Sequence, residues 1–131
     1  MDSYVPVERR KHPRVHLRVK VQCYRVEEDN SRGVGILHFT SRNISAGGIF
    51  LETKIPLKVG SLIYLRFALP GMKKPLATRA TIIGTQVKAI RGGDEKLEQV
   101  TGVGVEFLFL GHDEKKLIES FVSNTISGYA E

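Results

Sequence analysis

The chain has 131 residues, of which 41% are apolar and 26% charged, and its formal net charge is +6. This size and balance are typical of one folded domain, and no stretch is apolar enough for a membrane-spanning helix. The first residues, MDSYVPVERRK, lack the apolar segment of a secretory signal, and the single cysteine, Cys23, cannot form an internal disulfide. We therefore expect a cytoplasmic protein with no membrane insertion.

The positive charge is concentrated at the start of the chain. Residues 1–20 contain six Lys and Arg residues but only two acids, Asp2 and Glu8, which accounts for +4 of the total +6. Such a segment favours an anionic partner. Residues 1–12 show no hydrophobic periodicity, and Pro6 and Pro13 disfavour regular structure. We predict a flexible arm over residues 1–13, followed by a single domain over residues 14–131.

Six segments beyond the arm have the period-two pattern of strands. The first, over residues 14–24, alternates Val15, Leu17, Val19, Val21 and Cys23 with polar or amphipathic residues. The others are expected over residues 34–45, 47–54, 62–69, 77–90 and 100–110. Inward positions include Ile63, Leu65, Phe67 and Leu69 in the fourth segment, and Val103, Val105, Phe107 and Phe109 in the sixth.

The period then changes to that of a helix. In GHDEKKLIESFVSNTI the apolar residues that share one face are Leu117, Ile118, Phe121, Val122 and Ile126. Asp113 is suited to cap the start of this helix, and Gly128 to end it. Short strands followed by one helix predict a mainly β fold, a six-stranded antiparallel β-barrel with a C-terminal α-helix.

Motifs of common enzymes and cofactor sites are absent from the sequence. There is no phosphate-binding GxxxxGK loop, and the glycines of RGVGIL and TGVGVEF do not complete a dinucleotide-binding motif. His12 and His16 are four residues apart, but Pro13 and the strand pattern exclude a shared helical face. Cys23 lies on the inward side of its strand, as a structural thiol does. We expect no enzyme, no metal and no cofactor.

Two short polar stretches could bind a ligand. RRKHPR, at residues 9–14, presents guanidinium groups that bind phosphates and the edge of guanine. NISAGG, at residues 43–48, joins hydrogen-bonding Asn and Ser to glycines that allow close approach. Taken singly, the first is also typical of a loose basic tail, and the second of an ordinary β-turn.

Together the two stretches resemble the PilZ domain family. Its RxxxR motif matches Arg10 to Arg14, and its D/N-x-S-x-x-G motif matches Asn43, Ser45 and Gly48. The order of the motifs and the barrel-plus-helix outline also agree, and the resemblance covers about residues 8–125. It implies a non-catalytic bacterial receptor for cyclic di-GMP that signals to a downstream protein, with no nucleic acid as partner.

The resemblance also implies roles for individual residues. Arg10 and Arg14 would hold phosphates and guanine edges, Asn43 and Ser45 would hydrogen-bond the ligand, and Gly47 and Gly48 would keep the turn open. In this family, an arginine before RxxxR accompanies two intercalated ligand molecules. Arg9 occupies that position, so two cyclic di-GMP molecules per chain are expected.

The sequence departs from some relatives in lacking tryptophan, which stacks on a guanine there. We expect an arginine plane to replace it, or the affinity to be lower. Two alternatives stay open. One is a basic barrel that binds single-stranded nucleic acid, for which Tyr24 is an outward aromatic residue. The other is a PilZ-like adaptor that binds no nucleotide and acts by protein contact alone.

Overall fold

The computed structural model describes residues 13–25, 36–55, 57–91 and 97–130. The elements in chain order are β1 (Val15–His16), β2 (Lys20–Arg25), β3 (Leu37–Ile44), β4 (Gly48–Glu52), β5 (Leu62–Phe67), β6 (Leu76–Arg91), β7 (Leu97–Leu108) and α1 (His112–Ala130). The arm proposed for residues 1–13 lies outside the described residues, except for Pro13, which is exposed.

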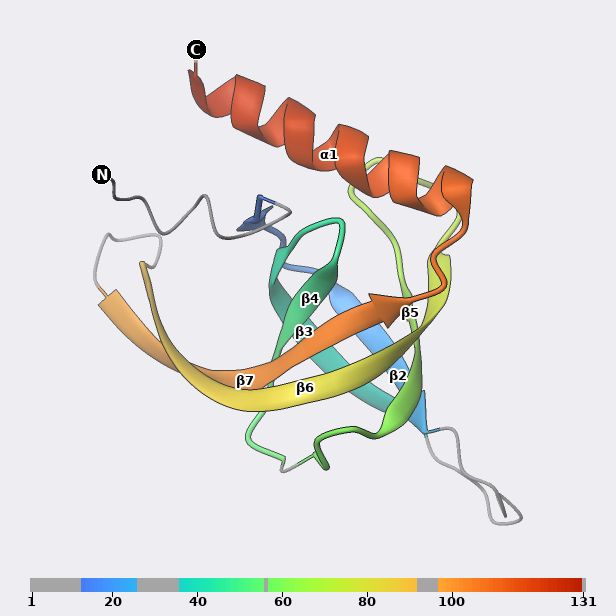
Figure 1. The fold of residues 1–131 in the computed structure, drawn as a ribbon. Helices are drawn as coiled ribbons and strands as arrows, with labels where there is room; N and C mark the ends of the chain where they lie inside the picture. The colour runs from blue at the N-terminus through green and yellow to red at the C-terminus, as the bar shows by residue number, and fades with distance from the viewer. Residues whose placement is uncertain (1–12, 26–35, 56, 92–96, 131) are drawn as a thin grey trace, which may run out of the picture.

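Six antiparallel strands close into a barrel, which confirms the predicted fold class (Figure 1). The hydrogen-bonded order is β3-β2-β5-β6-β7-β4, and β4 pairs back with β3 to close the ring. β1 is an additional short strand that pairs with β3. Closure gives each barrel strand two hydrogen-bonded neighbours, so the outer face is presented by side chains alone.

The segment predicted as one strand over residues 14–24 is divided in two. β1 and β2 pair with the same edge of β3, but Leu17, Arg18 and Val19 leave the ladder between them. The buried Ser41 hydroxyl bridges this break: it donates to the Leu17 carbonyl and accepts from the Val19 N–H, 3.0 Å away. A single continuous strand was therefore wrong. The Ser41 hydroxyl takes the Leu17 carbonyl and the Val19 N–H, whereas the Leu17 N–H and the Val19 carbonyl still bond to the β3 backbone at 3.2 and 2.9 Å.

The core lies inside the barrel, and alternation along the strands identified most of it. Cys23 is 1% exposed, as expected for an inward thiol, and Ile63, Leu65, Phe67 and Leu69 are all buried as predicted. Phe67 packs parallel to Phe107, with 6.1 Å between the ring centroids. Burial of these side chains is the main stabilising contribution in a barrel of this size.

Phe109 departs from the predicted pattern of the sixth strand. Val103, Val105 and Phe107 are buried, but Phe109 is 84% exposed and has a φ of 56°. β7 ends at Leu108, so the left-handed residue that follows turns the chain toward α1 and points its ring outward. Alternation could not predict this, because it holds only while the strand continues.

The terminal helix lies over one end of the barrel (Figure 1). Ile118 and Val122 enter the core, and Phe121 packs partly against it, whereas Leu117 and Ile126 are 37% and 44% exposed. The apolar face of α1 that is buried against the barrel is thus narrower than predicted. Both caps were also wrong, since the Gly111 carbonyl accepts the first helical bond from Lys115 N–H at 2.9 Å and the helix continues past Gly128 to Ala130.

Candidate ligand-binding site

One extra residue in β3 determines which way Asn43 faces. Ser41 pairs with Leu51 and Asn43 with Phe50, so Arg42 is a β-bulge with no partner of its own in β4. Ser41 and Ile44 are both buried, and simple alternation from Ser41 would direct Asn43 inward and Ile44 outward. The bulge reverses this phase, which places Asn43 on the outer face and Ile44 in the core.

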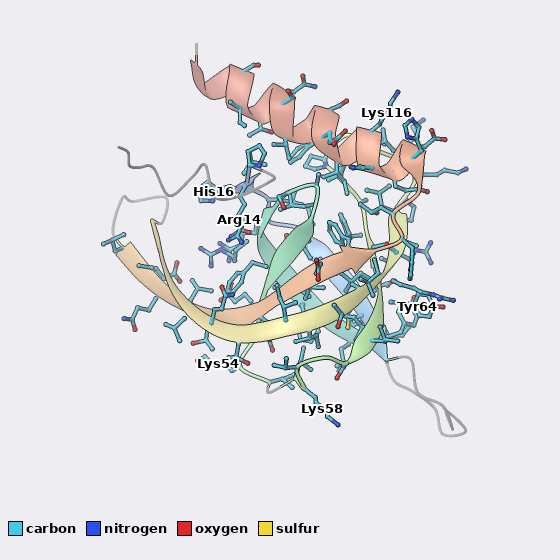
Figure 2. The ribbon with its side chains drawn as sticks, viewed as in Figure 1. Arg14, His16, Lys54, Lys58, Tyr64 and Lys116 are labelled. Carbon is cyan, nitrogen blue, oxygen red and sulfur yellow. The ribbon has the colours of Figure 1, made fainter. Side chains whose placement is uncertain are left out.

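The register of β1 on β3 brings the two sequence motifs together. Val15 pairs with Ile44 and His16 with Asn43, and Arg14 directly precedes this paired segment while Ser45 directly follows it. Val15 is buried, whereas Arg14 and His16 are exposed on the other side of the strand. Figure 2 shows Arg14 and His16 on the same side of the barrel. The last arginine of RxxxR and the N-x-S-x-x-G turn thus belong to one surface.

His16 is a member of this surface that sequence reasoning did not include. In the sequence, His16 stood out only together with His12, as a possible pair of metal ligands, and that pair was excluded. Its cross-strand position beside Asn43 depends on strand pairing, so the signal lies in the register and not in the local residue pattern. An exposed imidazole next to a basic arm adds a hydrogen-bond donor to the site.

The turn between β3 and β4 is held by its own hydrogen bonds. Ser45 N–H donates to the Gly48 carbonyl at 2.9 Å, and the Ser45 hydroxyl oxygen accepts from Gly47 N–H at 3.1 Å. Ser45 is only 8% exposed. The described residues give its hydroxyl proton no acceptor, so this proton is the group that Ser45 can offer a ligand.

Gly48 is required by strand packing. A Cβ at this position would lie 2.2 Å from the Val105 carbonyl oxygen on β7, a contact that backbone atoms cannot relieve without moving the strands. Gly47 is tied to the same strand, because its carbonyl accepts from Phe107 N–H at 2.9 Å. The glycines of the motif therefore fix the turn against β7, which presents Asn43 and Ser45 on a rigid support.

Arg42 is buried next to the motif and joins three strands. Its guanidinium donates to Glu52 Oε1 on β4 at 2.9 Å and to Glu98 Oε1 on β7 at 3.4 Å. The side chain is 7% exposed. The hydrogen bond to Glu52, opposed by burial and supported by Glu98, raises the pKa of Arg42 above its ordinary value. Arg42 thus serves to position the bulge rather than to contact a ligand from solvent.

A hollow of about 520 Å³ lies beside this network and is lined by residues of β3, β4 and β7 and by residues next to these strands. Its lining includes Arg18, Thr40, Glu52, Lys54, Gln99 and Thr101. The motif residues Arg14, Asn43, Ser45, Gly47 and Gly48 do not line it. Phe50, the neighbour of Asn43 on β4, is only 2% exposed, so its ring is not offered for stacking on a ligand.

Arg9 and Arg10 lie outside the described residues. Of the arginines in the basic stretch, the structure therefore gives a position only for Arg14. No helix in the described part of the chain has the length and apolar character needed to cross a membrane. Among the described side chains, no three His, Cys, Asp or Glu residues gather as metal ligands would.

Comparison with known families identifies the fold. The family model described as "PilZ domain" matches residues 8–124. The chain belongs to the PilZ domain family. Among curated proteins, none matches the sequence. The family match and the likeness to cyclic di-GMP complexes support a cyclic di-GMP receptor.

Solved structures of PilZ proteins share this fold. The PilZ domain of YcgR from Escherichia coli, solved with cyclic di-GMP, is 16% identical with a TM-score of 0.65, and the match covers 93% of this chain and 97% of that chain. The Bacillus subtilis inhibitor of motility, MotI, is 16% identical with a TM-score of 0.67, over 92% and 52% of the two chains. The MrkH–cyclic di-GMP complex of K. pneumonia is 24% identical with a TM-score of 0.67, over 95% and 55%. The chain thus spans about half the length of MotI and MrkH.

Proposed function

We propose that this PilZ domain is a non-catalytic receptor for cyclic di-GMP. The observation that supports the proposal is the register of β1 on β3, in which His16 pairs with Asn43 and the exposed Arg14 directly precedes Val15, the partner of Ile44. Guanidinium, imidazole, amide and hydroxyl groups then converge beside a rigid turn. A nucleotide with two phosphates and two guanines offers a matching acceptor to each of these donors.

The proposed ligand also explains the basic arm. Arg9, Arg10 and Arg14 would close over cyclic di-GMP held against the turn from Asn43 to Gly48. Each charge-assisted hydrogen bond contributes about 1.5–3 kcal/mol, whereas ordering the arm opposes binding by about 1–2 kcal/mol for each residue fixed. These terms are comparable, so the ligand orders the arm and changes the surface available to a downstream protein.

The number of ligands follows from Arg9. In the PilZ family, an arginine just before RxxxR accompanies two intercalated ligand molecules, and the absence of tryptophan leaves stacking to a guanidinium plane. We therefore propose two cyclic di-GMP molecules per chain.

Isothermal titration calorimetry with cyclic di-GMP tests the proposal. The wild type is expected to bind at tens of micromolar ligand or below, with a stoichiometry of two. Arg14→Ala is expected to weaken binding about tenfold to a few hundredfold, because one bidentate guanidinium is lost. Arg66→Ala is the matched control, since Arg66 is an exposed arginine on β5 that is not part of the motif surface. Its affinity should equal that of the wild type.

Cyclic di-AMP is the control for base recognition, because adenine lacks the O6 acceptor that an arginine reads on guanine. It should give no heat under the same conditions. An absence of heat from the wild type with cyclic di-GMP would refute the proposal. Equal affinities of Arg14→Ala and Arg66→Ala would refute the role of the arm, and a stoichiometry of one would refute the pair of ligands.

A further inference from the structure

The charges on the barrel strands are sharply divided between its two sides. β2, β3, β5 and β6 contain no Asp or Glu. The strand carboxylates are Glu52 on β4 and Glu98 and Glu106 on β7. Lys20, Arg66 and Arg79 are exposed on the carboxylate-free strands. The outer face of β2, β5 and β6 is therefore basic for reasons unconnected with the arm.

Two tyrosines lie side by side on this basic face. Tyr24 on β2 pairs directly with Tyr64 on β5, and Tyr64 pairs directly with Arg79 on β6. Tyr64 is 39% exposed, and Arg79 donates from Nε to its hydroxyl at 3.0 Å, with the guanidinium carbon 5.6 Å from the ring centroid. Tyr24 donates to Gln22 Oε1 at 3.4 Å. The result is a row of planar groups, Tyr24, Tyr64 and Arg79, across three strands.

Polar side chains form a second row beside the first. Gln22 pairs with Arg66 on one side and with His38 on the other. These residues line a shallow hollow of about 460 Å³, together with Lys20, Phe67 and Pro75. Cations and hydrogen-bonding groups thus lie two positions along each strand from the planar row.

We propose that this face, made by Lys20, Gln22, Tyr24, Tyr64, Arg66 and Arg79, binds single-stranded nucleic acid. Proteins that bind single strands combine aromatic residues on adjacent strands, which stack on bases, with cations that follow the phosphates. The sequence left this kind of partner as an alternative, with Tyr24 as its outward aromatic residue, whereas the family resemblance implied no nucleic acid. Strand pairing places a second tyrosine, Tyr64, beside Tyr24. The two residues are forty positions apart in the sequence, so no local pattern reveals that they are neighbours.

The alternative occupant is an acidic polypeptide, and the geometry favours the nucleic acid. Opposite charge alone would attract either partner. A row of planar side chains next to Gln22, His38 and Arg66 also matches flat bases with hydrogen-bonding edges, which an acidic peptide lacks. The face is distinct from the motif surface: Figure 2 shows Tyr64 and Arg14 on opposite sides of the barrel.

Fluorescence anisotropy with a labelled oligothymidine of about 12 nucleotides tests this proposal. The full chain should bind it at low salt, and Tyr64→Ala should weaken binding about fivefold to a hundredfold through lost stacking. Arg66→Gln should also weaken binding and reduce its dependence on salt. Lys116→Gln is the matched control for charge, because Lys116 is exposed on α1 (Figure 2). Its affinity should stay within about twofold of the wild type.

Two further probes separate stacking from charge. An abasic oligomer of the same length and charge, and polyglutamate, should each bind at least about tenfold more weakly than oligothymidine. Equal binding of the abasic oligomer or polyglutamate, or no binding of oligothymidine at low salt, would overturn the proposal. Circular dichroism checks that each variant is folded, and because Arg66 and Tyr64 are not part of the motif surface, this proposal and the cyclic di-GMP proposal fail separately.

Discussion

Gly48 shows how one residue links the binding motif to the stability of the barrel. Its backbone passes so close to β7 that a Cβ would lie 2.2 Å from the Val105 carbonyl oxygen. Gly84, on β6, lies in a strand as well, but nothing is within 4 Å of its Cβ position. The two positions therefore separate steric exclusion from the general cost of changing a glycine in a strand.

Gly48→Ala is expected to lower the free energy of unfolding by about 1–3 kcal/mol, because the strands must move apart to admit the methyl group. Gly84→Ala should change it by less than about 0.5 kcal/mol. Urea denaturation followed by circular dichroism measures both. If the two variants were equally stable, close packing would not be the reason for glycine at position 48.

At the same scale, the sequence identified the chemistry of the site but not all of its geometry. Residue type and spacing identified Arg14, Asn43 and Ser45, because short motifs can be recognised directly in the amino-acid sequence. They could not reveal His16 beside Asn43 or the burial of Ser45, since both depend on which strands pair. The left-handed Phe109 was likewise missed, because its conformation follows from where β7 ends.

At the scale of elements, Arg42 joins β3 to β4 and β7 through Glu52 and Glu98. A buried guanidinium that loses a carboxylate partner retains the cost of its own burial. Since the pKa of Arg42 is raised above an already high normal value, the group stays protonated near neutral pH. Its contribution is lost only above that raised pKa, so Arg42 itself adds no pH dependence near neutrality.

Glu52→Gln is expected to destabilise the protein by about 1–2 kcal/mol, less than the loss of a fully buried pair because Glu52 is partly exposed. Glu119→Gln, on the exposed side of α1, is the matched control and should be neutral within about 0.5 kcal/mol. Thermal unfolding at neutral pH compares them. Equal melting temperatures would show that the Arg42 network does not stabilise the bulge.

The order and type of elements were readable in advance, because period two and period 3.6 are strong signals. The division into β1 and β2 was not, since Val15 to Cys23 alternate without interruption. Only the contact of Leu17 and Val19 with Ser41 on another strand explains the break. For α1, the apolar face was correct in direction but too wide, because the barrel end covers Ile118 and Val122 and leaves Ile126 at the surface.

At the scale of the whole molecule, the two proposed binding surfaces lie on opposite sides of a closed barrel. Both would take anions, and the net charge of +6 favours each of them. Charges on opposite sides of the barrel are screened over a Debye length of about 8 Å at physiological ionic strength, but over about 30 Å at 0.01 M. The salt concentration therefore determines whether the charge of one bound ligand changes the affinity for the other.

We expect saturating cyclic di-GMP to leave the affinity for oligothymidine within about twofold at physiological salt. At 0.01 M salt it should weaken that affinity several-fold, because the bound phosphates reduce the net positive charge. Anisotropy titrations at the two salt concentrations measure this difference. Competition that persists unchanged at physiological salt would mean that both ligands occupy one surface.

The bulge at Arg42 has a consequence for engineering this domain. Deleting that single position would restore one-to-one pairing of β3 with β4 and would keep Asn43 outward and Ile44 inward, but it would remove the guanidinium that joins Glu52 and Glu98. The extra residue thus contributes a buried cation that connects β3 to β4 and β7, and the motif itself requires only that its asparagine occupy an outward position. Transplanting the six residues onto another hairpin would keep the asparagine exposed wherever the strand alternation directs that position outward.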